Sequence, residues 1–173
     1  MSAKAATGGQ GRAPAQRRGV GLAIAVLALV GTAISAYLAY VHYQGVSAVC
    51  LPIMECDEVL ASRYAQLWGV PLSLLGMGMY VALVVLGTLI WRGPGKWQGL
   101  VGLGAYTVAL SATVFSLYLY YLEIFEIEAF CTWCVASSLV VFSLMALTAV
   151  NVRSVLRSVG QSPSAAPSVA RTD

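Results

Sequence analysis

The sequence predicts an all-α membrane protein, a polytopic four-helix bundle with a cysteine-bearing outer loop between its first and second helices. The 173 residues are 59% hydrophobic and 10% charged, with a mean hydropathy of +0.79. Soluble domains carry roughly 25% charged residues, so this deficit is typical of membrane proteins. A soluble protein with four buried core helices is the alternative, but so short a chain leaves almost nothing to cover them.

Four windows without any Asp, Glu, Lys or Arg define the expected helices. Each is at least as long as the roughly 20 residues that a helix needs to cross a bilayer. The windows are Gly19–Val41, Val70–Trp91, Gly99–Leu122 and Ala129–Val152. They predict a transmembrane domain over residues 19–152, which contains all four cysteines, between two disordered cytoplasmic tails, 1–18 and 153–173. The first window is too long for a typical signal-peptide core, so we expect it to be a span.

The charges predict the orientation of the bundle. If four helices alternate, nine of the ten basic residues lie on one side and only Arg63 lies on the other. The positive-inside rule then places both termini in the cytoplasm and all four cysteines outside. In a bacterium this is the inner membrane with its cysteines in the oxidising periplasm, where disulfides persist.

The outer loop from His42 to Gly69 contains Cys50 and Cys56. Its later part, Asp57–Trp68, is expected to form an amphipathic helix on the membrane surface. Gly69 and Pro71 are expected to interrupt regular structure just before the second span begins. Arg92–Lys96 is expected to be a tight turn. In the spans, Gly76, Gly78, Gly102 and Gly104 suit close helix packing.

Cys131 and Cys134 form a Cys-x-x-Cys at the start of the fourth span. Three residues apart in a first helical turn, the two sulfurs are close enough to bridge. The unpaired N–H groups and the positive dipole end of that turn favour a thiolate, the form that reacts in disulfide exchange. The spacing pairs Cys50 with Cys56 and Cys131 with Cys134, as redox couples or as structural staples. A zinc site fits less well, because five residues separate Cys50 from Cys56.

The two pairs differ in depth, which suggests a relay. A pair at the start of a membrane-embedded helix can meet a lipid-soluble electron acceptor, whereas a water-soluble protein would reach the loop pair. Exchange through mixed disulfides would then join the two pairs.

The combined pattern resembles the bacterial branch of the vitamin K epoxide reductase family. It consists of four spans, Cys-x5-Cys followed by a serine (Cys50, Cys56, Ser62), Gly-x-Pro-x-Ser-x-x-Gly (Gly69, Pro71, Ser73, Gly76) and Cys131-x-x-Cys134. The resemblance implies that Cys134 is the nucleophile facing a quinone, ubiquinone or menaquinone, with Cys131 as its resolving partner. It also implies that Cys131 exchanges with Cys56, and that Cys50 forms the mixed disulfide with a separate periplasmic thioredoxin-like protein. Ser62 would support the loop or the reacting groups, and Ser138 would line the quinone pocket.

Departures from the family pattern bear on the substrate. Members that reduce vitamin K have an asparagine and a tyrosine where Leu72 and Ser138 stand here, which favours quinone over vitamin K epoxide. DsbB-like oxidases perform a similar reaction, but with the order of the cysteine pairs reversed. A membrane protein stapled by two structural disulfides is the non-catalytic alternative. His42 and the tyrosines 118, 120 and 121 are expected at the membrane interface, and Trp133 either packs over the acceptor or anchors there.

Overall fold

The computed structural model describes residues 12–51, 56–93 and 97–160, and within them it is helical with one short hairpin. Its elements are α1 (Arg12–Gln44), α2 (Cys56–Ala61), η1 (Arg63–Ala65), β1 (Gln66–Leu67), β2 (Val70–Pro71), α3 (Leu72–Arg92), α4 (Gln98–Leu122), η2 (Glu123–Ile127) and α5 (Thr132–Gly160). Four helices are long and apolar enough to cross a membrane: α1, α3, α4 extended by η2, and α5. The predicted fold class is therefore confirmed.

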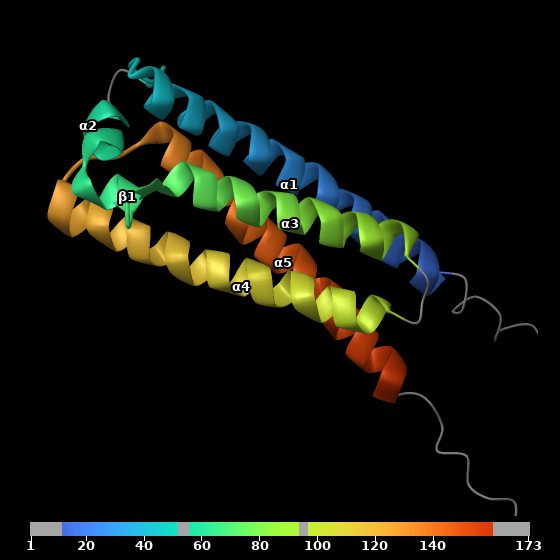
Figure 1. Cartoon of the computed structure of the whole chain (residues 1–173). Coiled ribbons are helices and arrows are strands. Elements are labelled where there is room, and N and C mark those ends of the chain that lie inside the picture. Colours follow the sequence, from blue (N-terminus) through green and yellow to red (C-terminus); the bar gives the residue numbers. More distant parts are fainter. Residues whose placement is uncertain (1–11, 52–55, 94–96, 161–173) are drawn as a thin grey trace, which may run out of the picture.

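The four long helices pack lengthwise as one bundle (Figure 1). Helix α1 packs against α3 and α5, and α4 packs against the same two helices. Helix α1 begins and α5 ends at one end of the bundle, while α2 and the hairpin β1–β2 cover the other. We call the end with α2 the cysteine end, because Cys50, Cys56, Cys131 and Cys134 all lie there.

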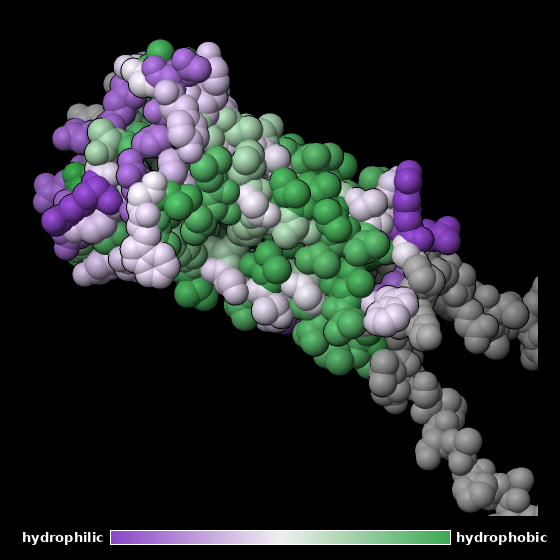
Figure 2. All heavy atoms as spheres, in the orientation of Figure 1, coloured by the Kyte–Doolittle hydropathy of each residue, from purple (hydrophilic) through white to green (hydrophobic). Residues whose placement is uncertain are grey.

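A band of apolar side chains covers the middle of the bundle on the face that Figure 2 shows. Polar residues gather at the cysteine end and again near the opposite end, so the face in view has the pattern expected of a bilayer-spanning protein. Large side chains such as Leu29, Val85, Val114 and Leu139 are more than half exposed on these helices. In water such a surface would be costly, and in lipid it is not. The chain is therefore a multi-pass helical membrane protein.

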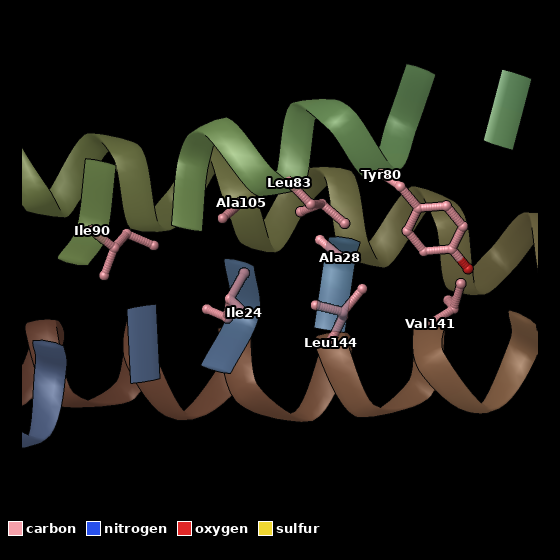
Figure 3. Close-up of a cluster of buried hydrophobic side chains, with 8 residues drawn as sticks. All are labelled: Ile24, Ala28, Tyr80, Leu83, Ile90, Ala105, Val141 and Leu144. Atoms are coloured by element: carbon pink, nitrogen blue, oxygen red, sulfur yellow. The ribbon is translucent and has the colours of Figure 1, made fainter. Parts of the chain in front are cut away.

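The interior away from the cysteine end is tightly packed. Its core joins Ile24, Ala28, Tyr80, Leu83, Ile90, Ala105, Val141 and Leu144 from all four long helices (Figure 3). Helices α1 and α3 meet there through glycines: a Cβ on Gly87 would lie 2.8 Å from the backbone nitrogen of Ala25. A Cβ on Gly31 would overlap the ring of Tyr80. Glycine therefore allows the backbones to approach closely, as is common between membrane helices.

The predicted packing glycines are not the ones that make the closest contacts. A Cβ on Gly78 would meet no atom within 4 Å, and one on Gly104 would only reach Leu86 at 4.0 Å. Gly76 and Gly102 do face neighbours. A Cβ on Gly76 would lie 3.2 Å from the Ser35 hydroxyl, and one on Gly102 would lie 3.6 Å from the Asn151 side chain. The sequence identifies the glycines that could allow close helix packing. Which of them do so depends on the side of the helix that faces a neighbouring helix.

Two helices extend beyond the predicted spans, which corrects part of the predicted tails. Helix α1 begins at Arg12 rather than near Gly19, and α5 continues to Gly160 rather than ending near Val152. Ala, Arg and Gln are good helix formers, and Pro14 lies in the first turn, where its missing N–H is not needed. The remaining parts of the two predicted tails, 1–11 and 161–173, lie outside the described residues, as do 52–55 and turn residues 94–96.

The predicted amphipathic helix Asp57–Trp68 is wrong beyond Ala61. Helix α2 ends at Ala61, η1 follows, and the chain then turns back as a hairpin in which Gln66 pairs with Pro71 and Leu67 with Val70. Trp68 and Gly69 make the turn with φ of 51° and 82°. Two positive φ angles in succession suit a two-residue hairpin turn and end any helix. Trp68 at its tip is 97% exposed.

Candidate active site

Cys131 is the N-cap residue of α5. Its carbonyl accepts the first intrahelical hydrogen bond, from the Val135 N–H at 3.1 Å. The backbone N–H groups of Trp133 and Cys134 point back at its sulfur. A cap side chain that accepts these N–H groups satisfies donors that the first turn otherwise leaves unpaired. The sequence correctly indicated a Cys-x-x-Cys at a helix start, and the structure assigns the cap position to the first cysteine.

These contacts lower the pKa of Cys131 from the ordinary thiol value of 9.0 to about 7. The largest cause is the hydrogen bond with the Cys134 side chain, and the two backbone N–H groups add to it. Burial and the nearby Glu123 charge act in the opposite direction. Cys131 is therefore the cysteine of this pair that is favoured as the thiolate, although its side chain is fully buried.

All four cysteines meet in one cluster. Cys50 and Cys56 form a disulfide with a Cα–Cα distance of 6.3 Å, while Cys131 and Cys134 are free thiols. Buried Cys56 and Cys131 pack together with Val59 and Ala129, and Cys50 and Cys134 lie against this group. The disulfide of the loop is thus held beside the thiols of α5, as exchange between the pairs requires.

Hydrogen bonds from two long helices hold the Cys50 segment in this position. The Trp133 indole N–H donates to the Val49 carbonyl at 2.8 Å, and the Val49 N–H donates to the Tyr37 hydroxyl at 3.0 Å. The rings of Tyr37 and Trp133 also pack on each other, with centroids 4.8 Å apart. One residue earlier in the chain, the Ala48 N–H donates to the Asp57 carboxylate at 2.9 Å. Trp133 therefore holds the segment that leads to Cys50.

A cavity of about 460 Å³ opens within the cysteine end, between all four long helices and the segment from α2 to η1. Of the four cysteines, only Cys134 contributes to its lining. Ser62 and Ser138, the two serines predicted to accompany Cys134 at a quinone, line the same cavity, as does Leu72. The three predicted cofactor-binding residues are thus brought together, and their roles remain predictions.

The serines are already engaged with the protein. Ser138 donates to the Cys134 carbonyl at 2.9 Å and pairs with the Ser116 hydroxyl at 2.8 Å, in a buried position. Ser62 donates to the Val59 carbonyl at 2.8 Å. Ser62 is therefore bonded to the helix α2 that begins at Cys56, and Ser138 is bonded to the first turn of α5.

Further polar groups of the cavity were not predicted as site residues. Tyr80 is almost fully buried in the middle of α3, and its hydroxyl pairs with the Ser137 hydroxyl at 2.7 Å. Glu123, at the start of η2, is only 4% exposed and contacts Cys134. In the sequence, Tyr80 could have been noticed as a tyrosine inside an uncharged span, and Glu123 as an acid at the end of one. His42, predicted at the interface, is half-buried and also contributes to the lining.

A metal centre finds no support in the described part of the chain. Among residues 12–51, 56–93 and 97–160, no group of three or more His, Cys, Asp or Glu side chains could hold a metal ion. Cys50 and Cys56 are bonded to each other, which removes them as thiolate ligands.

The fold and the site together define a class: a multi-pass helical membrane protein in which two cysteine pairs meet beside an internal cavity. Residues 22–149 match the model of the vitamin K epoxide reductase family. Because this match covers most of the chain, the protein belongs to that family, as its motifs predicted.

One curated relative is the protein named thiol-disulfide oxidoreductase LTO1 of Arabidopsis thaliana. It is 32% identical over 126 residues, which cover 69% of this chain and 33% of the relative. The chain thus spans about a third of the length of that relative.

Proposed function

We propose that the protein is a membrane thiol oxidoreductase that reoxidises a thioredoxin-like protein and transfers the electrons through its two cysteine pairs to a quinone. The observation that carries this proposal is the meeting of all four cysteines in one cluster, with Cys134 alone at the cavity wall. Membership of the family and the thiol-disulfide oxidoreductase among its relatives support the same chemistry.

The surroundings of the two cysteine pairs support electron transfer from the loop pair to the α5 pair. Cys50 lies on an exposed segment between Val49 and Leu51, which are both more than half exposed. Cys56 and Cys131 are buried beside each other. A protein substrate would therefore attack at Cys50, and exchange with α5 would pass through Cys56. By the positive-inside rule, this end faces the periplasm of a bacterial inner membrane.

The cavity suits a quinone by size and character. Ligand pockets of roughly 300–1,000 Å³ are typical, and they are mostly apolar with a few polar groups. This one has apolar walls from residues such as Leu75, Met79 and Phe115, with polar groups that include Ser138, Tyr80 and Glu123. A bound quinone would supply the acceptor for two electrons and two protons. Leu72 and Ser138 stand where vitamin K-reducing members have asparagine and tyrosine, so vitamin K epoxide is the less favoured substrate.

The exchange steps balance without any further reagent. A partner thiolate attacks Cys50, and the second partner thiol resolves that mixed disulfide, so the partner is oxidised and Cys50 and Cys56 are reduced. Cys56 then attacks Cys131 of the oxidised α5 pair, which releases Cys134. Cys50 closes the loop disulfide again and releases Cys131. The reduced α5 pair finally forms its disulfide and gives two electrons to the acceptor.

Two cysteine variants test this proposal. Cys134→Ser is expected to abolish quinone reduction, because it removes the sulfur at the cavity. Cys50→Ala is expected to slow oxidation of a thioredoxin-like protein far more than oxidation of dithiothreitol, which can reach the inner pair directly. Both rates are followed by quinone absorbance in membranes. Full turnover by Cys134→Ser, or equal losses in Cys50→Ala, would contradict the proposal.

A non-catalytic membrane protein stapled by disulfides is the second candidate. The disulfide between Cys50 and Cys56 favours it, but the free state of Cys131 and Cys134 does not. Alkylation separates the two functions, because a stapled protein has no thiol that cycles when reduced partner and quinone are supplied.

A further inference from the structure

Glu123 occupies an unusual position for an acidic side chain. It begins η2, a single π-helical turn that continues α4 toward the cysteine end. Turns of π-helix are rare and frequently lie at functional sites. The side chain is only 4% exposed, and its Oε2 atom has no hydrogen-bond partner. A buried polar atom without a partner is costly, so its retention calls for an explanation.

The surroundings of Glu123 explain why a buried carboxyl is retained here. Its carboxyl is hydrogen-bonded with the Cys134 thiol, and both side chains line the cavity. Among the described residues of this lining, none is Lys or Arg. Because an uncompensated charge is costly away from water, a proton that leaves the thiol is better transferred to the adjacent carboxylate than lost. Glu123 therefore has the contact and the open acceptor atom that a general base requires.

We propose that Glu123 is the catalytic base that takes the proton of Cys134 when the α5 pair is oxidised, and that it then delivers this proton to the electron acceptor in the cavity. The inference rests on the proposed function, and it assigns a residue that neither cysteine motif includes. Cys131 needs no such base, because its thiolate is stabilised by the hydrogen bond with the Cys134 side chain and by the backbone N–H groups of the helix cap.

The electrons and protons balance in this step. The sulfurs of Cys131 and Cys134 form one bond and release two electrons, both taken by the acceptor. One proton passes from Cys134 to Glu123 and then to an acceptor oxygen. The second proton reaches the acceptor from water, and it replaces the one that Cys131 gave up on becoming a thiolate. Glu123 returns to its carboxylate form and is ready for the next cycle.

Other titratable groups face the same cavity and could shape its pH dependence. Besides Glu123 and Cys134, the lining contains His42 on α1, Tyr64 on η1, Tyr80 on α3 and Tyr120 on α4. Tyr64 donates to Glu126 at 3.3 Å and Tyr80 pairs with Ser137, so both hydroxyls are engaged. His42 lines the cavity on α1, so a His42→Gln background distinguishes its contribution.

The test compares three variants of the full chain in lipid: Glu123→Gln, which keeps the shape, Glu123→Asp, which keeps the carboxyl, and the exposed control Glu128→Gln. The first readout is single-turnover oxidation of the reduced α5 pair by a short-chain quinone over a range of pH. Glu123→Gln is expected to slow this step about 100-fold or more, as for loss of a general base. Glu123→Gln should keep the acid limb that the Cys131 thiolate sets, and it should lose a second acid limb that Glu123→Asp retains, also in the His42→Gln background.

The second readout needs no quinone. With Cys50, Cys56 and Cys131 replaced by alanine, Cys134 is the only thiol, and its reaction with N-ethylmaleimide at pH 8 is measured. Loss of the neighbouring negative charge in Glu123→Gln should accelerate this reaction, roughly tenfold. Glu128→Gln should change neither readout.

The outcomes separate the inference from the proposed function. Wild-type protein that fails to oxidise its thiols with quinone overturns the function. A Glu123→Gln variant that alkylates at the wild-type rate, or oxidises within twofold of it, overturns the role of Glu123 while leaving the relay intact. Unchanged melting temperature in Glu123→Gln excludes a general folding defect as the cause.

Discussion

The two ends of the bundle use the same four helices in opposite ways. Away from the cysteines, glycines let α1 and α3 touch backbone to backbone, and the apolar core of Figure 3 fills the centre. At the cysteine end the helices enclose a cavity of about 460 Å³, and buried Ser138 and Glu123 contribute to its wall. Dense packing at one end therefore supports an open, mostly apolar interior with a few polar groups at the other.

The difference separates residues that hold the fold from those that do the chemistry. Tyr80 joins the two ends, because its ring packs in the core and its hydroxyl binds Ser137 at the cavity. Substitutions in the packed end should reduce stability and leave thiol chemistry intact. Substitutions at the cysteine end should do the reverse. The following predictions test this separation.

The largest expected effect on stability is at Gly87. In Gly87→Ala the new Cβ would lie 2.8 Å from a backbone atom of α1, which cannot move aside as a side chain could. Overpacking of this kind costs about 1–3 kcal/mol. Thermal unfolding in detergent measures it. Gly78→Ala on the same helix is the matched control, because its Cβ meets no atom within 4 Å. Equal melting temperatures for both variants would contradict the close contact of α1 with α3.

The next prediction concerns pH and the cysteine end. Because the pKa of Cys131 is lowered to about 7, its thiolate is present above that pH and is lost as pH falls through it. Single-turnover oxidation of the α5 pair should thus slow about tenfold for each pH unit below 7 and level off above 8. Stopped-flow absorbance of the quinone measures the rate. A midpoint near that of an ordinary thiol would show that neither the hydrogen bond with Cys134 nor the helix cap activates Cys131.

The smallest effect is expected at Trp133. Trp133→Phe keeps a ring against Tyr37 and removes the indole hydrogen bond to the Val49 carbonyl. Such a bond contributes about 1 kcal/mol, so amide hydrogen exchange in residues 46–51 should accelerate a few-fold. Trp68→Phe is the control, since Trp68 is 97% exposed at the hairpin tip. Unchanged exchange in Trp133→Phe would mean that the loop is held by other contacts.

Much of the architecture could be predicted from local sequence properties. Four uncharged windows sufficed for the four spans, since span length is set by the bilayer. The spacing of Cys131 and Cys134 at a span boundary indicated the helix start, because caps are local features. The Trp68–Gly69 turn was missed because a tryptophan with positive φ is uncommon. Of the two turn residues, only Gly69 indicated a turn.

The residues around the cysteines were harder to predict, because they depend on which helix faces which. Glu123 ends an uncharged window and therefore resembles the beginning of a loop. The π-turn instead continues the helix past it and brings the carboxyl to Cys134. Tyr80 likewise has no partner within reach along the chain, and it finds Ser137, 57 residues away. Such tertiary contacts leave no periodic signal in the sequence.

The central claim is that the sulfurs of the loop and those of α5 exchange directly. The most direct test uses a Cys50→Ser, Cys134→Ser double variant, in which only Cys56 and Cys131 remain. Mild oxidation in the membrane, followed by digestion and mass spectrometry without reductant, should yield one cross-linked peptide pair containing Cys56 and Cys131. Recovery of both cysteines as alkylated, unlinked thiols after the same oxidation would contradict the account.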